Sequence, residues 1–199
     1  MLLKELEPNP ELDLVEACQA GDPSAFEELV RRYKDRVYNV VYRYIGNHQD
    51  AEEVAQDVFL RAYHGLRGFR GGSRVYTWLY SIACNLAKNN VRDRGRKGRN
   101  KTTSLDALEE SSPGWGSSLA RSHSAPDVSL SAAESEAALQ QCLDELPDHY
   151  RMPFVLRTFD NLTYEEIAEV MGCPPGTVKS RLNQARTILH RRLKERAVL

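Results

Sequence analysis

Polar side chains that can hydrogen-bond to nucleic-acid bases gather in "GTVKSRLNQAR", residues 176–186. Arginine, lysine, asparagine and glutamine are the side chains that read base edges in the major groove of duplex DNA. Between residues 176 and 199 seven lysines and arginines stand against one acid, Glu195, and such an excess attracts phosphates. The candidate DNA-contacting residues in this segment are Thr177, Lys179, Ser180, Arg181, Asn183, Gln184 and Arg186.

A second polar stripe lies in "YTWLYSIACNLAKNNVRDR", residues 76–94. Asparagine is a weak helix former because its amide competes for the backbone, yet a helix is predicted here with Asn85, Lys88, Asn89 and Arg92 opposite its apolar stripe. A glycine-rich loop precedes it, and that loop supplies the further candidates Phe69, Arg70, Ser73 and Tyr76. Cations bind phosphates while amides and aromatic rings can bind an unstacked base, which favours single-stranded nucleic acid. The alternative is a solvated polar face with a solubilising basic run.

The elements that must position the first segment form a helix-turn-helix. Thr163 and Glu166 have the spacing of a capping box, and Gly172 can end the helix that they begin. A short turn with two prolines leads into a second helix, whose predicted apolar residues are Val178, Leu182, Ala185 and Leu189. Helix, short turn and helix make the DNA-binding plan. A helical hairpin with a solvated basic face is the alternative.

The elements around the second stripe are predicted from apolar residues at helical spacing. They indicate helices over residues 12–20, 23–46, 50–66 and 75–92. In the helix 50–66 the predicted buried residues are Ala51, Val54, Ala55, Val58, Phe59, Ala62, Tyr63 and Leu66. Its other face carries Asp50, Glu53, Gln56, Asp57 and Arg61. That face is predicted to meet either solvent or a protein partner.

The fold class that follows is all-α, with two small helical domains joined by a flexible acidic linker. Residues 11–101 and 133–199 are the predicted domains. Residues 102–132 are the predicted linker, because they are rich in serine, glycine and proline and lack periodicity. Trp115 and Leu119 are isolated apolar residues within it.

The composition excludes several classes of protein. The net charge of −1 over 199 residues argues against a uniformly basic nucleic-acid binder. The four cysteines lack zinc-ligand spacing, so we expect no metal and no cofactor. The start of the chain is acidic, unlike a signal peptide, and no apolar run reaches the ~18 residues of a membrane span. We therefore expect a cytoplasmic protein without membrane insertion.

Four ordered motifs resemble those of a known family. They are "AFEELVRRYKDRVY", "DAEEVAQDVFLRAY", "FRG…YTWLYSIACNLAKN" and "LTYEEIAEVMGCPPGTVKSRLNQAR". The first three are similar to region 2 of bacterial sigma factors and the fourth to their region 4. The chain as a whole resembles the extracytoplasmic-function (ECF) class of the sigma-70 family.

The resemblance implies a partner or a role for each candidate residue. The polar face of helix 50–66 would dock on the clamp helices of the largest subunit of core RNA polymerase, and the second domain on the flap of the second-largest subunit. The loop 69–76 and Asn85 would capture a flipped base of the −10 element, with Lys88, Asn89 and Arg92 along the displaced strand. Arg157 and Tyr164 would contact −35 phosphates, and Lys179, Ser180, Asn183 and Gln184 would read −35 bases. Positions 183 and 184 depart from relatives that have an aromatic residue and an arginine there. An anti-sigma factor is a further implied partner.

Two other functions would each account for part of the sequence. A stand-alone helix-turn-helix regulator would explain the second domain but would need no single-strand surface. An enzyme acting on nucleic acid would need a catalytic motif, and no GxxxxGK, GxSxG or HExxH is present. The expected function is therefore promoter recognition without catalysis.

Overall fold

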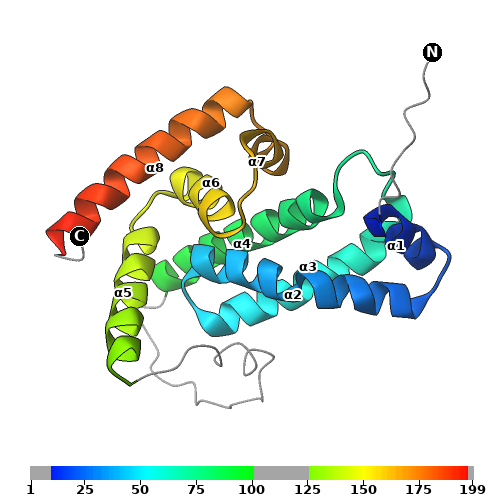
Figure 1. Ribbon diagram of the computed structural model, residues 1–199, viewed down its shortest axis with the longest axis horizontal. Coiled ribbons are helices and arrows are strands. Elements are labelled where there is room, and N and C mark those ends of the chain that lie inside the picture. Colours follow the sequence, from blue (N-terminus) through cyan, green and yellow to red (C-terminus); the bar gives the residue numbers. More distant parts are fainter. Residues whose placement is uncertain (1–9, 101–125, 197–199) are drawn as a thin grey trace.

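The computed structural model describes the backbone of residues 10–100 and 126–196, and side chains within 11–96 and 134–196 (Figure 1). Every regular element in these ranges is helical, which confirms the all-α prediction. The order is α1 (Pro10–Gln19), α2 (Pro23–Ile45), α3 (His48–Gly65), the 3₁₀ turn η1 (Leu66–Gly68), α4 (Val75–Asn100), α5 (Pro126–Asp144), α6 (Asp148–Phe159), α7 (Tyr164–Met171) and α8 (Pro175–Glu195). We call residues 10–100 the N-terminal part and residues 126–196 the C-terminal part. No helix within the described residues is long and apolar enough to cross a membrane.

Local signals set most helix ends. The side chain of Asp22 accepts a hydrogen bond from the Ser24 amide at 2.9 Å at the start of α2, and Gly46 ends that helix with φ 76°. At α7 the predicted capping box is present, because Thr163 and Glu166 bond reciprocally. Gly172 ends α7 in the left-handed conformation, also as predicted.

Two helices are longer than the sequence indicated. α4 continues to Asn100, past the expected end near Arg92, although Gly95 lies within it. An ion pair between Arg94 and Asp50 of α3 ties this extension to the helix beside it. α5 begins at Pro126, within the predicted linker 102–132. Proline suits a first helical turn, because a backbone N–H at that position would have no partner within the helix. The rest of the predicted linker, with Trp115 and Leu119, lies outside the described residues.

The apolar faces of the two parts share one buried cluster. α2, α3 and α4 pack side by side, and α6 and α7 lie against α2 and α4 (Figure 1). The buried residues of the N-terminal part include Leu29, Val37, Tyr44, Val58 and Leu79, and those of the C-terminal part in the same cluster include Met152, Leu156, Ile167 and Leu182. α5 and α8 enclose a smaller second cluster around Leu143 and Leu146. The two parts are therefore packed together, and the predicted domain boundaries stay a prediction.

Candidate nucleic-acid interface

One side of α8 shows a row of polar side chains to solvent. The exposed residues are Lys179, Ser180, Asn183, Gln184 and Arg186. The other side is buried at Val178, Leu182, Ala185 and Leu189, as predicted. Since the apolar side holds α8 against the rest of the C-terminal part, the polar side chains stand outward on a fixed helix. This is the geometry by which a recognition helix meets base edges.

Two further predicted members of this row, Thr177 and Arg181, are less exposed than the others. Arg181 is half-buried, and its Nη1 lies 3.8 Å from the Cys173 sulfur. Thr177 is also half-buried, and its carbonyl accepts a hydrogen bond from Ser180 at 3.0 Å. Both side chains are partly covered, and their contact with DNA stays a prediction.

Arg157 and Tyr164 are brought together beside the first turn of α7. The guanidinium of Arg157 lies 5.6 Å from the centre of the Tyr164 ring. It also donates to the carbonyl of Leu162 at 2.8 Å. These contacts hold the Arg157 guanidinium beside the N-terminus of α7. The cation and the backbone N–H groups of a helix N-terminus both attract an anion.

The second predicted stripe lines a cleft between the two parts. Asn85, Asn89 and Arg92 are exposed and Lys88 is half-buried. They form one wall of a cleft of about 670 Å³, whose other wall is made by Asp148, His149, Met171 and Arg181. The structure thus brings the whole stripe together, and places it opposite α6, α7 and α8.

The loop before α4 lies apart from this cleft. Phe69 packs on Trp78 with ring centres 5.1 Å apart, and Arg70 is exposed. Ser73 lines a separate cavity of about 350 Å³. The hydroxyl of Tyr76 accepts a hydrogen bond from Arg74 at 3.1 Å and donates one to Glu166 of α7.

The polar face of α3 is open to solvent at Glu53, Gln56, Asp57 and Arg61. Asp50, predicted with them, is instead paired with Arg94 of α4. Tyr63 was predicted to be buried, but it is 55% exposed, and its ring meets Phe26 edge-on at 5.0 Å. Leu60, which was not predicted, is 59% exposed. Its signal was present in the sequence, because an apolar residue three and four positions after Asp57 and Gln56 falls on the polar face.

Comparisons with known proteins agree with this geometry. The family model described as sigma-70 region 2 matches residues 29–97, and the one described as sigma-70 region 4 matches residues 136–189. The ECF RNA polymerase sigma-E factor of Escherichia coli strain K12 is 42% identical over 173 residues, which cover 87% of this chain and 88% of the relative. The chain belongs to the ECF sigma factors of the sigma-70 family. A further relative, the RNA polymerase sigma-H factor of Pseudomonas aeruginosa, is 38% identical over 180 residues, 90% of this chain and 92% of the relative.

Solved structures show the same fold. CnrH, in complex with the cytosolic domain of CnrY, has a TM-score of 0.69 at 21% identity and covers 94% of this chain and 99% of its own. The sigma factor RpoE from Bartonella quintana, in complex with the anti-sigma factor NepR, has a TM-score of 0.65 at 23% identity and covers 85% and 96%. As a sigma factor, the chain is a non-catalytic subunit of RNA polymerase that binds the polymerase and promoter DNA and directs promoter recognition.

In this sigma factor, polar contacts join the region 2 helices to the region 4 helices. Arg36 of α2 donates hydrogen bonds to both carboxylate oxygens of Asp160, the residue that follows α6, at 2.8 and 2.9 Å. These hydrogen bonds raise the pKa of the Arg36 guanidinium. The buried Arg151 donates to the carbonyl of Tyr44 at 2.8 Å. Each contact has one partner in each part, so each exists only while the two parts are packed.

Glu166 provides a further contact between the parts. It pairs with Arg74 at 3.6 Å and accepts from Tyr76. Burial alone would raise the pKa of Glu166, but the hydrogen bonds from Tyr76 and Thr163 and the charge of Arg74 together lower it. The capping-box carboxylate of the helix-turn-helix therefore also binds the start of α4.

Proposed function

We propose that this sigma factor divides promoter reading between duplex and single-stranded DNA. The exposed row on α8 is the observation that carries the first half. Its lysine, arginine, asparagine and glutamine side chains suit base edges in the major groove of the −35 element. Arg157, held beside the first turn of α7, suits a phosphate and positions the helix on the duplex.

The second half rests on the stripe of α4. Asn85 and Asn89 offer amides to an unpaired base, while Lys88 and Arg92 offer charges to its strand. Extruding a base from the −10 duplex costs a few kcal/mol of unstacking. Contacts with the polymerase and with the neighbouring strand would offset that cost. Phe69, Arg70 and Ser73 of the preceding loop and Tyr76 of the first turn of α4 lie outside the cleft, and they are proposed to enclose the base once the two parts have separated.

The polymerase is proposed to dock on α3. Glu53, Gln56, Asp57 and Arg61 form its polar face, and Leu60 adds an apolar centre. An exposed apolar residue within a polar rim is typical of a protein interface. The clamp helices of the largest subunit are the proposed partner there, and the flap of the second-largest subunit is proposed to bind the C-terminal part.

The packed arrangement must open for this function. The −35 and −10 elements lie about 25 base pairs apart, which is roughly 85 Å at 3.4 Å per pair. In the structure Arg181 of the recognition helix and Asn85 line the same cleft. Because one compact packing cannot span that distance, the two parts are proposed to separate when polymerase binds. An anti-sigma factor, such as NepR in the complex with the related RpoE, is proposed to act on the packed form.

Transcription by purified holoenzyme from a library of randomised promoters tests this division. We expect two conserved blocks about 25 base pairs apart. If the downstream block is already single-stranded, transcription should no longer need base pairs there. The upstream block should still have to be duplex. A single continuous duplex site would contradict the division into two surfaces.

A further inference from the structure

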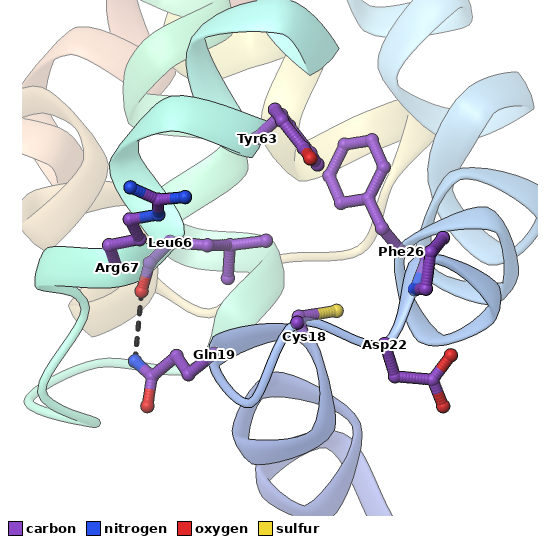
Figure 2. Close-up of a pocket in the computed structure, with 9 residues that line it drawn as sticks. Cys18, Gln19, Asp22, Phe26, Tyr63, Leu66 and Arg67 are labelled. Carbon is purple, nitrogen blue, oxygen red and sulfur yellow. Dashed lines mark hydrogen bonds between the residues drawn. The ribbon is translucent and has the colours of Figure 1, made fainter.

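α1 reaches the loop that precedes α4, although its sequence pointed to no functional role. It packs on α2 and on η1. Its last residue, Gln19, donates from Nε2 to the carbonyl of Leu66 at 2.8 Å and to that of Phe69 at 2.8 Å. The first of these bonds is drawn in Figure 2. A side-chain amide has two N–H groups, so both carbonyls can be satisfied at once.

α1 meets the same loop a second time near its start. A Cβ placed on Gly71 would lie 3.5 Å from Cδ2 of Leu12, so the loop backbone runs directly against this leucine. Leu12 also lines the cavity of about 350 Å³ together with Gly71, Ser73 and Arg74. The two contacts lie on either side of Arg70, one at Phe69 and one at Gly71.

We propose that α1 positions the base-capturing loop, with Gln19 as its main positioning residue. The inference rests on the proposed function, in which Phe69, Arg70 and Ser73 enclose a flipped base. Two successive glycines, Gly71 and Gly72, leave the loop backbone many conformations to lose on binding. Contacts from α1 at Phe69 and Gly71 remove part of that freedom before the DNA arrives. A preorganised loop then binds its base with less ordering cost.

The experiment uses the full chain, alone and as holoenzyme. Gln19→Glu keeps the size of the side chain but replaces the donor by an acceptor that faces two carbonyl oxygens. Gln19→Lys keeps a side-chain donor at this position. Glu16→Gln changes an exposed residue one turn earlier on α1 and is the matched control. Three quantities are measured: affinity for core polymerase, holoenzyme affinity for single strands with a matched or a mismatched −10 base, and hydrogen exchange of the amides of residues 69–74.

We expect Gln19→Glu to bind core polymerase normally and the matched strand about five- to tenfold more weakly, which is the low end for two partly exposed hydrogen bonds. The mismatched strand should lose less, so base discrimination falls, and exchange in the loop should rise. Gln19→Lys should recover most of the affinity, and Glu16→Gln should behave as the wild type. Equal losses for both strands, or wild-type discrimination by Gln19→Glu, would overturn the positioning role. If the wild-type holoenzyme itself showed no discrimination, the proposed function would fail first.

Discussion

The ion pair between Arg36 and Asp160 gives a quantitative prediction for the equilibrium between packed and separated parts. The side chain of Asp160 is only 7% exposed and that of Arg36 is 45% exposed. Asp160→Asn keeps the shape of the side chain and removes its charge. A hydrogen bond to a charged group contributes about 1.5–3 kcal/mol. Because water can reach Arg36 and one amide oxygen remains, we expect a loss of about 1.4 kcal/mol, which shifts the equilibrium roughly tenfold toward separation.

Energy transfer between dyes on exposed residues of the two parts measures this shift. Glu27 on α2 and His190 on α8 are exposed positions outside the proposed interfaces. Transfer should fall in Asp160→Asn, and binding of a −10 single strand by the free protein should tighten. The reversed pair, Arg36→Asp with Asp160→Arg, should restore transfer toward the wild-type level. Unchanged transfer in the single variant, or no recovery in the double variant, would refute the reasoning.

Three further predictions concern the DNA-contacting side chains, the polar face of α3 and the cysteines. Gln184 substitutions should change the preferred −35 base, while Arg157→Ala should lower the affinity for all −35 sequences alike. Binding to a −35 sequence library measures both, and identical sequence profiles would contradict the division between base and phosphate contacts. Leu60→Glu should lower the affinity for core polymerase at least tenfold with an unchanged thermal midpoint, because the side chain is 59% exposed; a lower midpoint with normal affinity would reassign Leu60 to the fold. Burial raises the pKa of Cys84 to about 12. A thiol reagent at pH 8 should therefore modify the half-buried Cys173 in the native protein and Cys84 only after unfolding. Rapid reaction of Cys84 in the native protein would contradict its burial.

Structural features that depend on residues a few positions apart in the chain could be predicted from the sequence. The capping box at Thr163, the end of α7 at Gly172 and the apolar side of α8 depend on residues a few positions apart. The same is true of the stripe of Asn85 and Arg92, since helical spacing alone places them on one face. Local chemistry decides these elements, so local reasoning finds them.

Contacts between distant residues could not be predicted in this way. Arg36 and Asp160 are separated by 124 positions, and neither residue type indicates its partner. The half-burial of Arg181 depends on the fold of the turn before it, and the cleft around Asn85 depends on how the two parts pack. Tyr63 was misplaced because apolar spacing indicates which face can be buried, while neighbouring elements decide how far along the helix that face is covered.

Permanganate probing of a promoter bound by holoenzyme tests the central claim most directly, because it reports unpaired thymines in the −10 region. Asn85→Ala should bind core polymerase as the wild type does and form a closed complex at the −35 element. We predict that its −10 thymines stay unreactive, or become reactive at least tenfold more slowly. Reactivity at the wild-type rate and extent would contradict the assignment of Asn85 and its stripe to strand capture.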